Sequence, residues 1–125
     1  MAANSTIILN SQSHTDSNAS PMDLVSEKFK GAGFYGMGDG FHTVQIQLTS
    51  FKGTISIQGS LATSPADEDW VNVSLDSSEG SVTEITYGAI TSSNKVYNFI
   101  GNFVWVRAVV SNWTTGAINR VLLNY

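Results

Sequence analysis

The sequence predicts an all-β fold, an antiparallel β-sandwich of jelly-roll type with about eight strands. Segments in which apolar and polar residues alternate recur along the chain, and turn residues separate them. No segment shows the 3.6-residue period that marks an amphipathic helix. Residues that favour strands (Val, Ile, Thr, Phe, Trp and Tyr) number 44 of 125, against 33 for Ala, Leu, Glu, Lys, Gln, Arg and Met.

The central part of the chain gives the clearest strand signals. Apolar residues at Val44, Ile46 and Leu48 alternate with polar ones, as in a strand buried on one face. Turn residues follow at 50–53, and alternation resumes over 55–61, so we expect these two segments to pair as a hairpin. Further strands are expected at 70–75, 82–87, 95–99, 103–110 and 117–125.

Residues 1–30 differ in character from residues 31–125, which we expect to form a single sandwich domain. The first thirty residues are expected to be an extended arm, or a first strand followed by a polar linker. The short apolar run in this segment is Ile7, Ile8 and Leu9. We expect residues 1–10 to be held by strand pairing or by a neighbouring subunit, and to be removable without loss of the fold.

Composition and charge exclude several functional classes. The chain has no cysteine, which excludes disulfide scaffolds, thiolate zinc sites and cysteine nucleophiles. Its formal net charge is −4 with only six lysines and arginines, which argues against nucleic-acid binding. No apolar run approaches the roughly 18 residues of a membrane span, and the first residues lack the pattern of a signal peptide. We therefore expect neither nucleic acid nor membrane as a partner.

No arrangement of residues points to catalysis, to a cofactor or to a metal. The glycines at 31–36 match the dinucleotide fingerprint, but a strand pattern follows where that motif needs a helix. The acidic segment 67–69 could offer oxygen ligands to calcium, although a solvated loop fits three adjacent carboxylates better. His42 lies near Asp39, but no Gly-x-Ser-x-Gly elbow accompanies them. We expect a protein that is not an enzyme.

The segment 103–110 is the most informative part of the chain. Its even-numbered positions are all apolar and form a core stripe, while the opposite face carries Phe103, Trp105, Arg107 and Val109. A strand with two apolar faces must be covered on both sides, or must offer one face to another molecule. Trp and Arg are also enriched at binding hot spots. Two interpretations remain open: the N-terminal arm or a long loop covers this face, or a neighbouring subunit does.

Trp113 precedes the last strand, and we expect it to be exposed in the turn. It could stack on a carbohydrate together with Trp70 or Tyr87, contact a protein, or cover the open end of the sandwich. The candidate binding residues are Ile7, Ile8, Leu9, Phe103, Trp105, Arg107 and Trp113.

Several segments resemble a known family. They are an opening strand with a polar linker at 7–13, the segments 44–48 and 53–60, and the stretches 69–73, 105–108 and 117–123. Their order resembles the small β-sandwich structural proteins of tailed-bacteriophage virions, which include capsid-decoration and tail or baseplate components. The resemblance implies a non-enzymatic virion protein that binds capsid or tail subunits in many copies, with homo-oligomers expected. The alternative is a carbohydrate-binding, host-recognition module of a phage or bacterial surface protein, with a surface glycan as partner.

Overall fold

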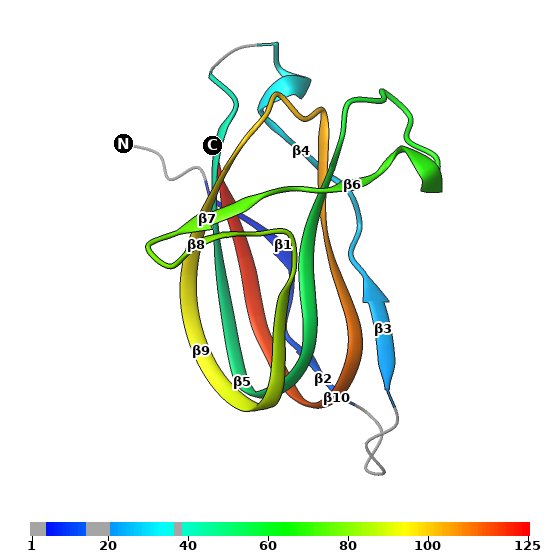
Figure 1. The fold of residues 1–125 in the computed structure, drawn as a ribbon. Helices are drawn as coiled ribbons and strands as arrows, with labels where there is room; N and C mark the ends of the chain where they lie inside the picture. Colours follow the sequence, from blue (N-terminus) through cyan, green and yellow to red (C-terminus); the bar gives the residue numbers. More distant parts are fainter. Residues whose placement is uncertain (1–4, 15–20, 37–38) are drawn as a thin grey trace.

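The computed structural model describes residues 5–14, 21–36 and 39–125. It is 67% strand and 5% helix, and its sheet pairings are antiparallel, which confirms the predicted all-β sandwich. Three long strands make up most of the fold: β5 (Phe41–Ser60), β9 (Ile85–Ile100) and β10 (Trp105–Asn124). Figure 1 shows that they run side by side, with β5 between the other two.

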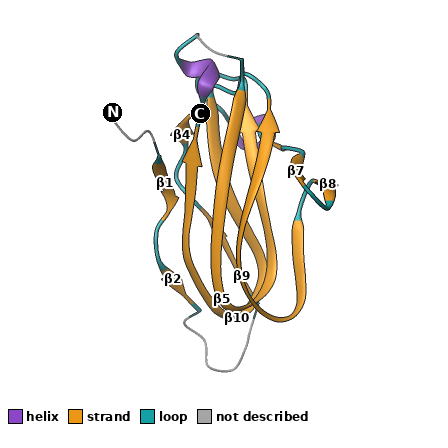
Figure 2. Cartoon of the chain, turned by 90° about the vertical axis from the view of Figure 1, so that its left-hand side faces the viewer, coloured by secondary structure: helices purple, strands orange, loops and turns teal. Residues whose placement is uncertain are grey.

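Each long strand folds over near its middle and so contributes to both layers of the sandwich (Figures 1 and 2). In the first layer, residues 43–49 of β5 pair with 117–124 of β10, and in the second layer residues 54–60 pair with 105–111. The register shifts between these two stretches, and Ser50 and Asn112 adopt positive φ angles of 50° and 51° where the strands bend. The β5–β10 ladder is therefore irregular at this end of the sandwich, where Thr115 opposite Lys52 is the pair between the two regular stretches.

This arrangement corrects the predicted hairpin. Residues 43–49 and 55–61 do not pair with each other, because the two halves of β5 lie in opposite layers and pair with the halves of β9 and β10. The turn residues at 50–53 bend one strand over the core instead of joining two neighbouring strands of a hairpin.

Shorter elements complete the two layers. In the first layer β1 (Thr6–Leu9) flanks β10, while β7 (Leu75–Ser77) and β8 (Gly80–Val82) follow β9. In the second layer β3 (Met22–Val25) and β4 (Phe29–Lys30) pair with β10, and β6 (Val71–Asn72) pairs with β5. β2 (Gln12–Ser13) pairs with β10 at Ala117 and Ile118. The two 3-10 turns are η1 (Ala32–Phe34) and η2 (Asp67–Asp69).

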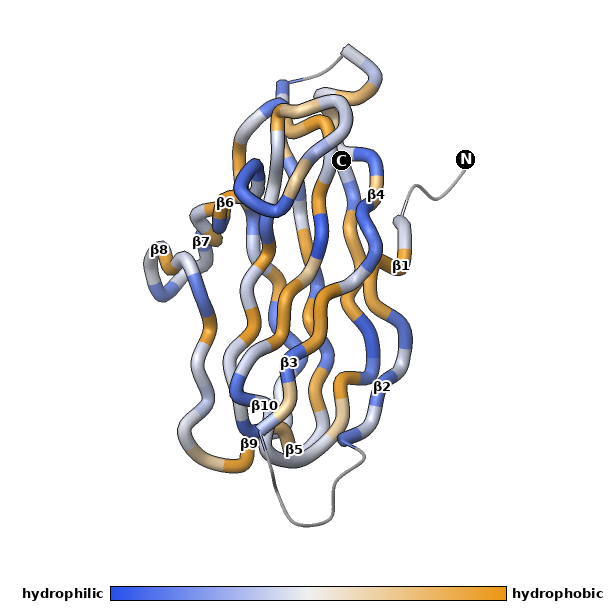
Figure 3. The backbone as a smooth tube through the Cα atoms, turned by 90° about the vertical axis from the view of Figure 1, so that its right-hand side faces the viewer, coloured by the Kyte–Doolittle hydropathy of each residue, from blue (hydrophilic) through white to orange (hydrophobic). Residues whose placement is uncertain are grey.

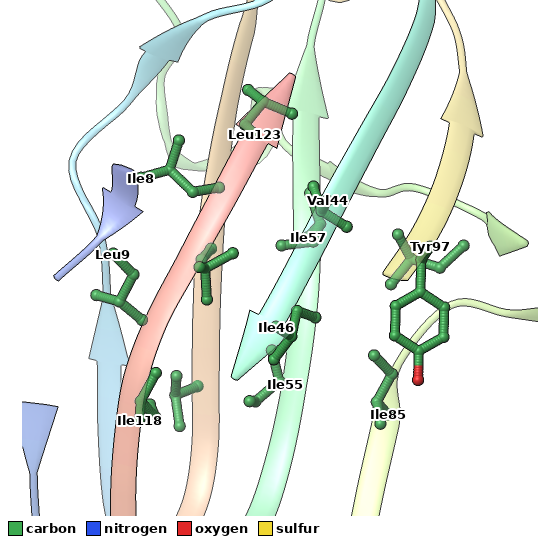
Figure 4. Close-up of a cluster of buried hydrophobic side chains, with 14 of the residues drawn as sticks. Ile8, Leu9, Val44, Ile46, Ile55, Ile57, Ile85, Tyr97, Ile118 and Leu123 are labelled. Carbon is green, nitrogen blue, oxygen red and sulfur yellow. The ribbon is translucent and has the colours of Figure 1, made fainter. Parts of the chain in front are cut away.

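The hydrophobic core lies between the layers. Figure 4 shows Val44 and Ile46 from one half of β5 and Ile55 and Ile57 from the other half in the same cluster. Polar and apolar residues alternate along the long strands in Figure 3, which is the pattern expected when one face of each strand is buried. The period-two signal in the sequence therefore identifies the inward face correctly.

The N-terminal strand β1 belongs to this core. Its residues pair with 121–123 of β10, so the expected strand pairing of this segment is confirmed for residues 6–9. Ile8 and Leu9 are only 2% and 6% exposed, whereas Ile7 is 45% exposed. The burial contradicts the expectation that residues 1–10 are dispensable for folding, because truncating a buried Ile or Leu to Ala costs about 2–5 kcal/mol. Residues 1–4 lie outside the described part of the chain.

Trp113 is not the exposed aromatic predicted from its place in a turn. The bend of β10 directs the indole inward, where it is 1% exposed and lies 6.1 Å from the Phe51 ring. Its Nε1–H donates to the carbonyl oxygen of Thr115 at 3.0 Å. The inner side of a bend that joins the two layers faces the core. Trp113 lies on that side of β10 and therefore closes this end of the sandwich.

The bends also explain why glycine is needed at position 116. Gly116 has a φ of 90°, and a Cβ atom there would overlap the carbonyl group of Ser50. Gly88 of β9 would place a Cβ in open space. We predict that Gly116→Ala lowers the free energy of unfolding by about 2 kcal/mol or more, while Gly88→Ala changes it by about 0.5 kcal/mol or less.

Urea denaturation of the two alanine variants and of the wild type measures both values. Equal losses for the two variants would contradict the tight approach of the β5 and β10 bends.

Candidate functional site

The outer face of the second layer carries a group of cations stacked on aromatic rings, which we call the cation–aromatic surface and define as Lys28, Lys30, Trp70, Trp105 and Arg107. The Lys28 Nζ lies 4.6 Å from the centre of the Trp105 ring, and the Arg107 Cζ lies 4.2 Å from the centre of the Trp70 ring. The Lys30 Nζ lies 4.5 Å from the centre of the Phe34 ring. Three of the chain's six basic residues therefore gather on one face.

The alternation of β10 and its pairing with β4 create this surface. Val106, Ala108 and Val110 are fully buried, so the residues between them point outward. Lys30 lies directly opposite Trp105 in the β4–β10 ladder. The Trp105 Nε1–H donates to the carbonyl oxygen of Thr63 at 2.9 Å. The half-buried Trp105 is thus held by two segments of its own chain, one on each side.

Arg107 is fixed by a chain of hydrogen bonds across three strands. Its Nε–H donates to Gln58 Oε1 at 2.8 Å, and Gln58 Nε2 donates to Asn72 Oδ1 at 3.0 Å. Burial lowers the pKa of Arg107, and the nearby charge of Asp67 opposes this effect. The guanidinium remains charged at neutral pH. Held in one position and stacked on Trp70, it is a preorganised positive group on an acidic protein.

A shallow groove adjoins the cation–aromatic surface. Its volume is about 280 Å³, and its lining residues are Thr6, Lys28, Phe29, Lys30, Tyr35, Trp105 and Tyr125. Small-molecule sites typically measure about 300–1,000 Å³ and enclose their ligand. Burial and a hydrogen bond with Tyr35 raise the pKa of Tyr125 to about 12, so its hydroxyl is neutral. The size and shape of the groove suit a side chain or short segment of a macromolecule.

The lysines of the groove keep their charge available. Among the described residues, the one ion pair joins Lys95 and Glu79 at 3.8 Å. Lys28 and Lys30 lie over rings and are exposed, with no carboxylate of the described chain within ion-pair distance. The groove is therefore positive although the chain as a whole is negative.

Behind the groove, His42 has a structural role. Its side chain is fully buried and stacks on Phe99 with ring centres 4.5 Å apart. Nε2 accepts a hydrogen bond from the backbone N–H of Ala32 at 3.1 Å, so Nδ1 carries the proton and donates to the Gly40 carbonyl at 2.8 Å. Burial lowers the pKa of His42, although the Gly40 carbonyl and the charge of Asp39 oppose this. The imidazole is neutral and satisfied within the fold.

This burial predicts a pH dependence of stability. Below about pH 6.5 the unfolded chain protonates His42 while the folded chain does not, so the free energy of unfolding falls as the pH drops, by up to about 1.4 kcal/mol per pH unit. The fall ends once the pH passes the lowered pKa of the folded state. In His42→Gln, which stays neutral, this slope should be lost.

Urea denaturation between about pH 7 and pH 5 measures the slope. The wild type, measured in the same buffers, is the reference for this slope. An unchanged slope in His42→Gln would contradict the assignment to His42.

Of the seven predicted site residues, three reach the surface, three lie in the core and Phe103 is intermediate. Trp105, Arg107 and Ile7 reach the surface, whereas Ile8, Leu9 and Trp113 point into the core. Phe103 precedes β10 and does not follow its alternation. Its half-buried ring packs against Gly59 and Gly101 at the edge of the core. Whether the three residues that reach the surface bind a partner stays a prediction.

Sequence reasoning missed Lys28, Lys30 and the pair of tyrosines at 35 and 125. The spacing of Lys28 and Lys30 is a usable signal, because residues two apart in an extended segment share a face. Nothing in the sequence shows that this face lies beside Trp105, since that depends on pairing between positions about 75 residues apart.

The acidic segment 67–69 forms η2, and all three side chains are exposed. Asp69 Oδ2 accepts a hydrogen bond from the backbone N–H of Ala66 at 2.8 Å. In the part of the chain that the structure describes, no three His, Cys, Asp or Glu side chains are grouped to hold a metal ion. Likewise, none of its described helices is long and apolar enough to cross a membrane.

Comparison with known proteins defines the fold more closely. The sequence matches no protein-family model and no curated protein. Among solved structures, the chain is similar to YomS, a protein derived from the SPBc2 prophage, with a TM-score of 0.56, 13% identity, and coverage of 98% of this chain and 96% of YomS. At this identity the likeness shows a shared β-sandwich fold.

Two further solved structures have lower scores. A family 29 carbohydrate-binding module from Piromyces equi gives a TM-score of 0.48 at 6% identity, with coverage of 100% of this chain and 93% of the module. The K1 adhesin domain of Lys-gingipain from Porphyromonas gingivalis gives 0.49 at 10% identity, with coverage of 82% and 62%.

Proposed function

We propose that the protein is a non-enzymatic structural component of a bacteriophage virion. In this role it binds capsid or tail subunits in many copies, and the cation–aromatic surface is its contact face.

The arrangement around Trp105 and Arg107 carries this proposal. Both side chains are half-buried and held by hydrogen bonds within the chain, so little conformational entropy is lost when a partner covers them. Trp, Tyr and Arg dominate binding hot spots. The adjacent groove is shallow, as expected for a surface that meets another protein. A subunit repeated over a lattice can rely on individually weak contacts, because linked sites gain avidity.

Two further observations support a phage origin. The prophage-derived protein YomS shares the fold over nearly the whole of both chains. The order of segments in the sequence resembles that of small virion β-sandwich proteins. This resemblance is independent of the likeness to YomS. The first observation supports a phage-associated protein, and the second supports the virion as its location.

The test is the copy number of the chain in purified phage particles, measured by quantitative mass spectrometry. We predict several copies per particle for the wild type and at least about a tenfold loss for Arg107→Glu, because a carboxylate replaces the stacked cation on Trp70. Lys52→Glu makes the same charge change at the exposed bend of β5, away from this face, and should leave the copy number unchanged.

Circular dichroism establishes that both variants are folded. Absence of the wild-type chain from particles would overturn the virion role. Normal incorporation of Arg107→Glu would overturn the assignment of the contact face.

Carbohydrate binding is the second candidate, and one observation favours it. A shallow depression of about 440 Å³ on the first layer is lined by Gln47, Leu48, Ser92, Ser93, Asn94 and Asn119. Amide and hydroxyl groups of this kind can hydrogen-bond sugar hydroxyls. The buried Trp113 offers no ring face to a sugar.

A glycan array tests carbohydrate binding. This candidate predicts hits that are abolished in Asn94→Ala and retained in Asn72→Ala. An array without hits at high protein concentration rejects it.

A further inference from the structure

We propose that the cation–aromatic surface is self-complementary, and that two copies of the chain form a two-fold dimer in which the acidic turn η2 of each copy contacts Lys28 and Lys30 of the other. This inference names one partner within the multi-copy assembly proposed above, and it rests on that proposal for its biological setting.

The charges on this face are complementary but unpaired within one chain. Lys28 and Lys30 have no carboxylate of the described residues within ion-pair distance. Asp67 and Glu68 are exposed, and no basic residue forms an ion pair with them within the described chain. Asp69 caps η2 through the Ala66 N–H. One molecule therefore presents two cations and two anions on neighbouring segments, and none of the four forms an ion pair within the described chain, although Asp67 lies near Arg107.

The two charged segments lie side by side on one face. The Thr63 carbonyl accepts the hydrogen bond from Trp105, and Trp70 stacks on Arg107, so the 63–70 loop borders the surface on one side. Lys28 covers Trp105, and Lys30 pairs with Trp105 across the β4–β10 ladder. Figure 3 shows β4 and β6, the strand that follows the loop, at the same end of the molecule.

This placement satisfies the geometry of a two-fold contact. In an isologous interface the same patch meets itself, so a region i that contacts region j on the partner is matched by j contacting i. A two-fold axis that lies in the plane of this face and runs between the loop and β4 brings each acidic turn onto the lysines of the other copy. Eight charges, four from each copy, are then brought together with opposite signs in two equivalent contacts.

Exposed apolar side chains around the charges supply the buried surface area that ion pairs alone do not provide. Exposed ion pairs are individually too weak to hold a dimer. Leu61 is 69% exposed, Phe34 42% and Tyr35 53%, and all three lie in the segments that border the surface. Their burial with Trp105 supplies the apolar centre of the contact, and the charges fix its orientation.

Charge reversal tests the contact directly. One double variant combines Lys28→Glu with Lys30→Glu, and the other combines Asp67→Lys with Glu68→Lys. Sedimentation velocity at about 50 mM and 500 mM salt should show a wild-type dimer that is weakened at high salt. Each double variant alone should be monomeric, with its dimer dissociation constant raised at least about tenfold by like charges.

An equimolar mixture of the two double variants should restore the dimer, because both contacts of the mixed pair again join opposite charges. The control variant, Lys52→Glu with Glu84→Lys, changes exposed charges elsewhere and should dimerise like the wild type. Circular dichroism shows that each variant is folded.

A monomeric wild type at about 100 μM, well above the micromolar range of transient contacts, would overturn the inference. So would dimerisation of either double variant alone, or failure of the mixture to associate. Measuring the copy number of the chain in particles distinguishes a wrong dimer inference from a wrong proposed function. A monomer that is still incorporated keeps the virion role and points to an acidic segment of a different subunit, whereas a chain absent from particles removes the role itself.

Discussion

Strand β10 is the constraint on which the rest of the structure depends. Its twenty residues pair with β5 along both layers and with β1, β2, β3 and β4 on the other side. Its inward residues, among them Val106, Ile118 and Leu123, are fully buried. The same strand therefore joins the two layers, anchors the N-terminal segment and presents Trp105 and Arg107 outward. Because one strand does all of this, the backbone that forms the core also positions Trp105 and Arg107 on the outer face.

The outer surface is organised mainly by neutral hydrogen bonds between strands. Thr43 bonds to Asn98, Gln45 to Asn94, and Thr49 to Asn119, in each case from side chain to side chain across neighbouring strands. These contacts do not depend on ionic strength in the way that ion pairs do. Against this weakly charged background, the three stacked cations of the second layer are a distinct feature, which is why we place the partner contact there.

The sequence predicted the fold class and the inward face of the strands, because period-two alternation reports burial directly. It could not distinguish a hairpin from a strand that bends over the core, since the residues at 50–53 serve either. For the same reason Trp113 was expected outside. Of the candidate site, Trp105 and Arg107 can be predicted from the sequence because their strand is apolar on both faces. Lys28 and Lys30 join them only through pairing that is distant in sequence.

Hydroxyl-radical footprinting of the free protein, diluted so that it is monomeric, and of intact particles tests the central claim most directly. If the cation–aromatic surface is the contact face, oxidation of Trp105 and Tyr35 falls several-fold in the particle. Trp113, which is buried in either state, stays unmodified and serves as the internal reference. Equal oxidation of Trp105 and Tyr35 in the free and assembled protein would show that this face remains open to solvent, and would contradict the account.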